Sequence, residues 1–361
     1  MKYPLRNRFF GVENVITNYI AVFLHINKMY MKKVSIKDIA QKAGVSNATV
    51  SLVLSGKSKN GRVGKETAEE IHRIARELNY QPNNLARSLQ SGRSQTIGLL
   101  VADISNPFFG TLAFYIQEQF EKSGYAVIIM NTNESDVQMG KMIGILKNRQ
   151  VDGYIIVPTE HGESYVKQLV DANMPLVLID RYYPAIQTYS VMLDGYQASF
   201  KATRLLIEKG CKRIGLLVYD GTQSHMSDRK YGYIDALKQV GLYDSELICE
   251  VNFSNFQEDV SKAITNLIEK KVDGIFFVTI SISLAGIRAL FNQGIKVQED
   301  IQVVCFDRSE VFDFLPHPLP YILQPIEAMA HKAVEFLLEQ IETDDYVIQT
   351  SKFPPTLVNR M

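Results

Sequence analysis

Two short helices joined by a glycine turn are the first part of the chain whose residue types suit a chemical task. Ser35 stands where a helix N-cap is expected, Asp38 follows three residues later as its capping-box partner, and Gly44 turns the chain. The second helix directs valines toward a core and leaves short or uncharged side chains on its other face, namely Asn47, Ala48, Ser51 and Leu52. Such a face suits the major groove of DNA, although an ordinary amphipathic helix pair would show the same pattern.

Charge separates this head from the rest of the chain and favours the DNA interpretation. Residues 31–95 carry twelve lysines and arginines against five acidic residues, and residues 1–30 carry four against one. Because the whole chain has 39 of each sign, residues 96–361 hold 23 basic and 33 acidic residues. A basic head on an acidic body is typical of a protein that contacts DNA phosphates through the head alone.

Length and composition predict a soluble globular protein of two or three domains, since 46% of the 361 residues are hydrophobic and 22% are charged. The three cysteines are widely spaced in apolar surroundings, so we expect buried free thiols in a reducing compartment, with no disulfide and no metal site. These are Cys211, Cys249 and Cys305. The protein is therefore expected to be cytoplasmic.

The first thirty residues predict no structured element. Their apolar run at 15–26 is too short to span a membrane, and no small-residue cleavage site follows it. Met29 and Met31 stand directly before the helix pair. We expect translation to start at one of them, which makes residues 1–30 a start-site artefact or a disordered extension.

The remaining elements of the head set the domain boundaries. Residues 65–78 have the apolar spacing of a third helix, which completes a three-helix domain at 31–81. Pro82 breaks the pattern, and residues 83–89 have room for only two helical turns, which are marginal in water without a partner. We assign 82–94 to a hinge helix and linker, and 95–361 to the body.

The body contains an internal repeat. Residues 97–103 (IGLLVAD) recur as 214–220 (IGLLVYD), and residues 151–157 (VDGYIIV) recur as 272–278 (VDGIFFV). The two motifs are 54 residues apart in the first copy and 58 in the second, which indicates two copies of one unit. Each copy alternates strand and helix patterns. The repeat therefore predicts two Rossmann-like α/β lobes, with a ligand cleft at the carboxyl ends of their parallel strands.

Motifs for catalysis are missing from the sequence. It contains no G-x-G-x-x-G or P-loop for a nucleotide, no G-x-S-x-G nucleophile elbow and no H-E-x-x-H zinc motif. The six histidines are scattered along the chain. We therefore expect a binding protein that is not an enzyme, with no catalytic residue, no metal and no cofactor.

Head, hinge and doubled body together resemble the lac repressor family, or LacI/GalR family, of bacterial transcription regulators. The resemblance runs from about residue 34 to residue 357 and is most specific at 44–51 (GVSNATVS), 86–89 (ARSL) and 103–109 (DISNPFF). It implies a helix-turn-helix head and a body folded like a type I periplasmic sugar-binding protein. It also implies a homodimer, repression of transcription, and operator affinity switched by a small, sugar-like effector in the cleft. Lobe one would comprise about 95–191 and 324–350, and lobe two about 192–323 and 351–361.

The resemblance assigns DNA contacts to the second helix and the hinge. Asn47 and Ala48 fall at base-reading positions, and Thr49 and Ser51 fall near phosphates. Leu89 would wedge into a central base step of the minor groove, where the cost of unstacking, about a few kcal/mol, is offset by wider contact. The residues expected at DNA are Ser46, Asn47, Ala48, Thr49, Ser51, Leu52, Asn84, Arg87 and Leu89.

The sequence differs from the family at two places that bear on which operator sequence the protein recognises. Leu52 stands where many members carry arginine, and leucine cannot make the paired contact to guanine. The loop 58–63 is longer than usual. The operator sequence therefore does not follow from the family.

The resemblance also nominates strand-end residues for the effector site. Arg229 can offer paired donors to hydroxyls or an acid, and the rings of Phe108 and Phe109 suit a sugar or a planar ring. The expected set is Asp103, Asn106, Phe108, Phe109, Asp180, Arg181, His225, Arg229, Phe253, Asp307 and Gln324. The alternative for each is a strand-end residue that caps a helix or pairs across the lobes. The family's usual Asn-Asp pair is absent near Ile280 and Ser281, which changes that wall of the cleft.

Two other functions stay open on the sequence. A solute-binding receptor for a transporter would share the body, but it needs export and has no use for a basic head. A regulator controlled by a partner protein would share the whole architecture, and loss of polarity in the cleft would favour it. Because the nominated residues are polar, we expect a small-molecule effector. The other expected partners are double-stranded operator DNA and a second copy of the chain, with no membrane contact.

Overall fold

The computed structural model of the chain describes residues 34–55, 63–80, 92–343 and 347–359. The chain divides into two compact units, one ending at Ala86 and the other beginning at Arg87. The expected start sites, the hinge helix and its residues Asn84, Arg87 and Leu89 lie outside the described residues. In the described part of the chain, no helix combines the length and apolar character needed to cross a bilayer.

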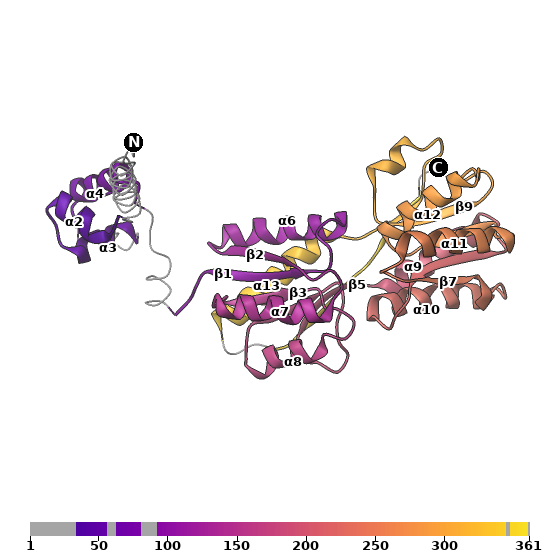
Figure 1. Cartoon of the computed structure of the whole chain (residues 1–361), viewed down its shortest axis with the longest axis horizontal. Coiled ribbons are helices and arrows are strands. Elements are labelled where there is room, and N and C mark those ends of the chain that lie inside the picture. Colours follow the sequence, from indigo (N-terminus) through magenta and orange to yellow (C-terminus); the bar gives the residue numbers. More distant parts are fainter. Residues whose placement is uncertain (1–33, 56–62, 81–91, 344–346, 360–361) are drawn as a thin grey trace, which may run out of the picture. The chain divides into compact units, whose positions relative to one another are not determined.

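The head contains the three helices that the sequence predicts, α2 Ile36–Ala43, α3 Asn47–Leu54 and α4 Lys65–Glu77 (Figure 1). Ser35 and Asp38 form the expected capping box at the start of α2. Gly44 ends this helix with φ 67°, a left-handed conformation that glycine adopts at little cost. Ile39, Val50 and Ile71 form the centre of the core, one from each helix, with no exposed surface.

Lobe one is built on a six-stranded sheet in the order β11-β5-β4-β3-β1-β2, in which every neighbouring pair is parallel. Helices α6 and α13 pack on one face of this sheet, and α7 and α8 pack on the other (Figure 1). The elements are β1 Thr96–Val101, α6 Pro107–Lys122, β2 Ala126–Asn131, α7 Asp136–Asn148, β3 Gly153–Ile156, α8 Glu163–Asp171, β4 Leu176–Ile179, β5 Tyr189–Leu193, α13 Ile326–Glu342 and β11 Thr350–Phe353.

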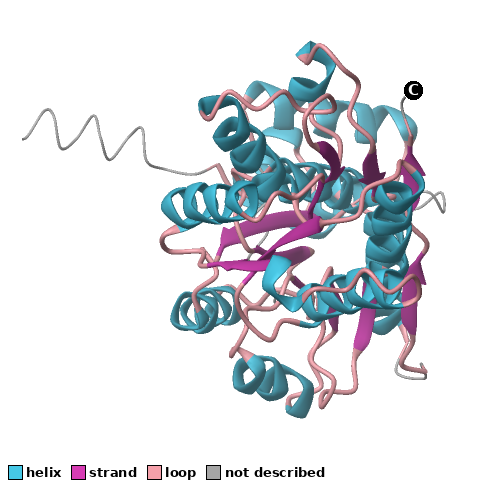
Figure 2. Ribbon diagram, turned by 90° about the vertical axis from the view of Figure 1, so that its right-hand side faces the viewer, coloured by secondary structure: helices cyan, strands magenta, loops and turns pink. Residues whose placement is uncertain are grey.

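Lobe two repeats this plan with a sheet in the order β12-β10-β9-β8-β6-β7, parallel except for the antiparallel edge strand β12. Its helices pack in the pairs α9 with α10 and α11 with α12. Figure 2 shows helices on both sides of the strands. The elements are α9 Gly195–Glu208, β6 Ile214–Tyr219, α10 Ser224–Lys238, η2 Ser245–Leu247, β7 Ile248–Val251, α11 Phe256–Glu269, β8 Gly274–Phe277, α12 Ile280–Asn292, β9 Gln302–Phe306, η3 Glu310–Phe314, β10 Tyr321–Leu323 and β12 Thr356–Val358.

The internal repeat is confirmed, because β1 and β6 hold the same place in their two sheets, as do β3 and β8. The lobe boundaries lie slightly later than the sequence suggests. Parallel pairing of β5 with β11 continues to Leu193 and Phe353. The chain therefore passes from lobe one to lobe two after each of these residues, and not after residues 191 and 350. All three cysteines are buried and free, as expected.

Candidate functional site

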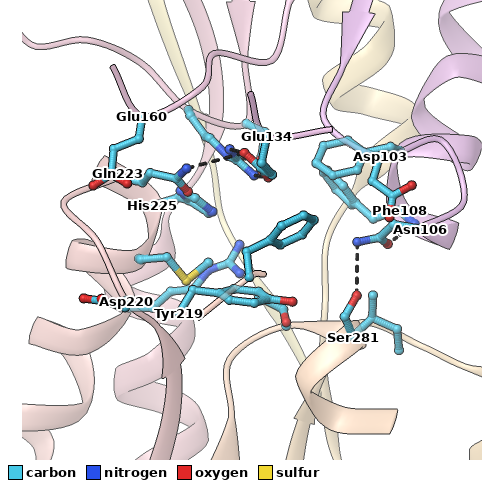
Figure 3. Close-up of a pocket in the computed structure, with 18 of the residues that line it drawn as sticks. Asp103, Asn106, Phe108, Glu134, Glu160, Tyr219, Asp220, Gln223, His225 and Ser281 are labelled. Carbon is cyan, nitrogen blue, oxygen red and sulfur yellow. Dashed lines mark hydrogen bonds and ion pairs between the residues drawn. The ribbon is translucent and has the colours of Figure 1, made fainter. Parts of the chain in front are cut away.

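A cavity of about 370 Å³ lies between the lobes, where the carboxyl ends of their strands meet (Figure 3). All eleven residues that the sequence nominates for the effector line this cavity. Lobe one contributes Asp103, Asn106, Phe108, Phe109, Asp180 and Arg181, lobe two contributes His225, Arg229, Phe253 and Asp307, and Gln324 lies where the chain passes from lobe two to lobe one. The structure thus gathers in one place side chains that are more than two hundred residues apart in sequence.

Arg229 of α10 is the buried cation of lobe two. It is 4% exposed, its Nη1 donates to the carbonyl of Val278 at 2.7 Å, and its guanidinium lies 3.8 Å from the centroid of the Phe306 ring. Burial lowers the pKa of Arg229, while the carboxyl groups of Asp180 and Asp307 act against this. Its Nε is buried without a hydrogen-bond partner among the described residues. Arg229 therefore keeps a donor for a ligand, because buried polar groups are normally paired.

Asp307 and Gln324 form a second buried polar pair beside Arg229. Asp307 follows β9 with φ 63°, and its two carboxylate oxygens accept from Nε2 of Gln324 at 3.0 and 3.1 Å. Burial raises the pKa of Asp307 to about 7, although Arg229 and Gln324 favour the ionised form. Oε1 of Gln324 is buried without a partner among the described residues. This pair can accept hydrogen bonds from ligand hydroxyls.

The cleft arginine of lobe one is paired with carboxylates, although its Nε is buried without a hydrogen-bond partner among the described residues. Nη1 and Nη2 of Arg181 donate to the two carboxylate oxygens of Glu134 at 2.7 and 2.6 Å, and Nη1 also donates to the carbonyl of Pro158 at 3.2 Å. Its Nε lies 3.4 Å from Oδ2 of Asp180. Burial lowers the pKa of Arg181, but Glu134 and Asp180 more than offset this and raise it. Arg181 therefore forms part of the cleft wall, and the carboxylates of Glu134 and Asp180 neutralise its charge.

The two lobes are joined directly across the cleft. Glu160 accepts from the backbone amide of Thr222 at 2.5 Å and from its hydroxyl at 2.9 Å. Nδ2 of Asn106 donates to Oγ of Ser281 at 3.4 Å, and Nε2 of Gln223 donates to Glu134 at 3.5 Å (Figure 3). Ser281 thus supplies a polar contact on the wall that lacks the family's Asn-Asp pair.

Several nominated residues also have local structural roles. The carboxylate of Asp103 accepts from the amide and hydroxyl of Ser105, and the side chain of Asn106 caps α6 by accepting from the amide of Phe108 at 3.0 Å. Phe108 and Phe109 are buried and pack edge to face, with centroids 5.0 Å apart. The cap alternative therefore holds for Asn106, while Asp103 closes a turn before the helix, and both residues also line the cavity.

The two remaining nominees of lobe two lie at the start of α10 and on an exposed loop. Nδ1 of His225 is buried without a hydrogen-bond partner among the described residues, and burial together with Arg181 and Arg229 lowers its pKa, which keeps the ring neutral. Phe253 is 46% exposed, and its ring centroid lies 6.1 Å from that of Tyr219.

Sequence reasoning missed other residues that line the cavity. Glu134 and Glu160 follow β2 and β3, so the rule that polar residues at strand ends meet in the cleft would have found them. Among the described residues, no three His, Cys, Asp or Glu side chains are grouped so that they could hold a metal ion. The missed residues are Asn133, Glu134, Ser135, Glu160, Tyr219, Asp220, Gln223, Met226, Asn252, Ser254 and Thr279. Ile280 and Ser281, which the sequence places on a wall of the cleft, also line the cavity.

Helix α3 presents a second candidate surface, on the head. Asn47, Ala48 and Ser51 are exposed, while Val50 and Val53 are buried, which is the division of faces that the sequence predicts. The hydroxyl of Ser46 accepts from the amide of Thr49 at 3.1 Å and so caps the helix.

Two family models match the chain. Residues 35–83 match bacterial regulatory proteins of the lacI family, and residues 94–359 match the periplasmic binding proteins and sugar-binding domain of the LacI family. The chain belongs to the LacI family. The family consists of transcription regulators, so the protein is a DNA-binding regulator and not an enzyme.

Named relatives of this LacI-family chain align over nearly its whole length. It is 31% identical to the ribose operon repressor of Halalkalibacterium halodurans, over 90% of this chain and 96% of that protein. It is 28% identical to the transcriptional repressor PurR of Actinobacillus pleuropneumoniae serotype 3, over 90% and 97%.

Solved structures show the same fold. A complex of the regulator CelR with cellobiose matches with a TM-score of 0.68 and 25% identity, over 91% of this chain and 99% of that one. The lac repressor dimer bound to operator and the anti-inducer ONPF matches with a TM-score of 0.80 and 21% identity, over 91% and 98%. The second likeness concerns the fold alone.

Proposed function

We propose that this LacI-family regulator is a cytoplasmic repressor whose operator affinity is switched by a small, uncharged, hydroxyl-rich molecule bound between the lobes. The observation that carries the proposal is a polar cleft whose lining keeps buried nitrogen and oxygen atoms without partners among the described residues, on Arg181, His225, Arg229 and Gln324. Relatives named as repressors and the cellobiose complex of CelR support this proposal.

The charge of the cleft supports an uncharged effector. Six carboxyl groups line it against two arginines, and one of those arginines, Arg181, is paired with Glu134 through both Nη atoms. A phosphate or carboxylate in the same volume would face a net negative wall at short distance, which is unfavourable at low dielectric. Hydroxyl groups can accept from Arg229 and donate to Asp307 without that penalty. The polarity of this lining also disfavours a partner protein as the effector.

On the head, the proposal places the exposed face of α3 in the major groove. Asn47 and Ala48 would face base edges, while Ser46, Thr49 and Ser51 would lie near phosphates, with Leu52 at the far end of this face. The hinge residues Asn84, Arg87 and Leu89 are proposed for the minor groove by resemblance to the family.

Exposed apolar side chains support a homodimer. In lobe two, Phe314 is 85% exposed, and Phe291 and Val311 are also exposed. In lobe one, Phe114 is 63% exposed and Ile104 is exposed as well. Apolar surface of this kind commonly marks an interface. A second copy that covers it would bring two heads to a two-fold symmetric operator.

The experiment for DNA recognition is a selection from randomised duplexes with the full chain. We expect an enriched, roughly palindromic sequence whose binding weakens steeply with salt. Leu89→Ala should lower affinity for that sequence far more than affinity for arbitrary DNA, because the wedge acts only where a base step is kinked. No enriched symmetric sequence from the parent protein would contradict the repressor proposal.

The experiment for the effector is a thermal-shift screen of the full chain against sugars and their phosphorylated forms, tested as matched pairs. A ligand at a hundred times its dissociation constant should add about 2.7 kcal/mol to the free energy of unfolding. We expect stabilisation by a neutral sugar and none by its phosphate ester. Stabilisation by the phosphate ester alone would contradict the proposed ligand class.

A further inference from the structure

Asp152 fastens the first residues of the body, where the chain arrives from the hinge. Its Oδ1 accepts from the amide and the hydroxyl of Ser94 at 2.7 and 3.0 Å, and its Oδ2 accepts from the amide of Gln95 at 2.7 Å. In return, the amide of Asp152 donates to the carbonyl of Thr96 at 2.8 Å. One carboxylate thus holds two consecutive residues, and bonds of this charge-assisted kind are stronger than neutral ones.

The segment that Asp152 holds follows a bent path. Gly92 has φ 71° and Gln95 has φ 52°, and a left-handed conformation is unfavourable for a residue such as glutamine. Arg93 donates from Nη2 to the carbonyl of Ile341 near the end of α13 at 2.6 Å. The carbonyl of Gln95 accepts from the amide of Ala126 at 2.9 Å. Residues 93–95 are therefore fixed to three separate parts of lobe one.

The internal repeat places the same device in lobe two. Asp273 accepts from the amide of Lys212 at 2.7 and 3.0 Å and from the amide of Arg213 at 2.8 Å, and its own amide donates to the carbonyl of Arg213. There, however, the preceding element is α9 of the same lobe. The two aspartates have the same local chemistry, but only Asp152 holds the chain that leads to the head.

We propose that Asp152 is a positioning residue that couples lobe one to the DNA-binding segment. With residues 93–95 fixed, a movement of lobe one carries the end of the hinge with it. Without the anchor, these residues could move relative to lobe one, and the head would sample more positions for any given position of the lobe. This proposal rests on the proposed function, because it needs a specific operator against which the head is positioned.

The test compares Asp152→Asn with Asp273→Asn in the full chain. The first readout is the affinity for the selected operator relative to arbitrary DNA of the same length. We expect Asp152→Asn to lower this ratio about tenfold, the size expected for loss of one well-formed interaction, and Asp273→Asn to keep the parent's ratio. The second readout is hydrogen exchange of the Ser94 and Gln95 amides, which should become at least about tenfold faster in Asp152→Asn only.

If Asp152 acted in folding alone, the two variants would have the same ratio of operator affinity to affinity for arbitrary DNA, since both carboxylates stabilise the start of a central strand. Equal operator ratios for the two variants would therefore overturn the coupling role, as would unchanged exchange at Ser94 and Gln95. If Asp152→Asn fails to fold, Ser94→Ala removes one of its three bonds and should give a smaller loss of the same ratio. A parent protein that binds no duplex specifically would overturn the proposed function, and the coupling role with it, whatever the exchange result.

Discussion

The two lobes share one scaffold but use their arginines differently. An Asp-Arg pair follows β4 in lobe one and β9 in lobe two, and both aspartates are left-handed, with φ 70° at Asp180 and 63° at Asp307. Arg181 turns inward to Glu134, and its side chain is 8% exposed, whereas Arg308 pairs with Asp313 at the surface and is 55% exposed.

The helix that follows the first strand of each lobe shows the second difference. In lobe two this helix is α10, which carries Arg229, while α6 in lobe one has no arginine. Lobe one therefore presents an arginine whose charge is neutralised by a carboxylate, while lobe two presents Arg229, whose Nη1 donates to a backbone carbonyl. We therefore expect lobe two to contribute most of the directional contacts to the proposed effector.

The largest expected effect concerns the two arginine pairs. Glu134→Ala leaves Arg181 buried without its main partner, so we expect the free energy of unfolding to fall by about 3 kcal/mol or more. Arg308→Ala breaks only an exposed pair and should cost less than about 1 kcal/mol. Denaturant midpoints of the two variants measure the contrast. Equal losses would show that the lobes do not differ in this way.

The second prediction uses the protonation of Asp307. Because the folded-state pKa of about 7 lies above the value of about 3.9 expected when unfolded, the folded protein binds this proton more tightly. The stabilising contribution is complete below pH of about 4 and is lost as the pH rises through about 7. Between pH 5 and 8, the parent should lose about 3 kcal/mol more than Asp307→Asn in denaturant unfolding. The same pH dependence in both proteins would exclude Asp307 as its source.

The smallest effect tests the part of the comparison in which the lobes agree. A Cβ at Gly98 would lie 2.6 Å from a methyl group of Leu146, and one at Gly215 would lie 2.8 Å from a methyl group of Leu267. Both sites are in the first strand of a lobe, so alanine at either should overpack the core by about 1–3 kcal/mol. Thermal unfolding of the two variants should show similar losses, and a loss at only one site would argue against equivalent packing.

Patterns with a strong physical cause could be predicted from the sequence. The capping box at Ser35, the turn at Gly44 and the doubled strand motifs each depend on local chemistry or on repetition, and all are present in the structure. The cleft members were identified by resemblance and by their place at strand ends. The partners of these residues could not be predicted in this way. The pairing of Arg181 with Glu134 depends on how the segments that follow β2 and β4 meet in space, and nothing in the spacing of 47 residues indicates it.

The measurement that tests the account most directly is titration of operator binding with the effector found in the screen, for the parent, Arg229→Ala, Asp307→Ala and the surface control Arg308→Ala. The account predicts that Arg229→Ala and Asp307→Ala bind the operator without effector much as the parent does, yet lose the effector response. Arg308→Ala should keep the parent's midpoint. If Arg229→Ala and Asp307→Ala also keep that midpoint, the effector does not bind in the cleft between the lobes.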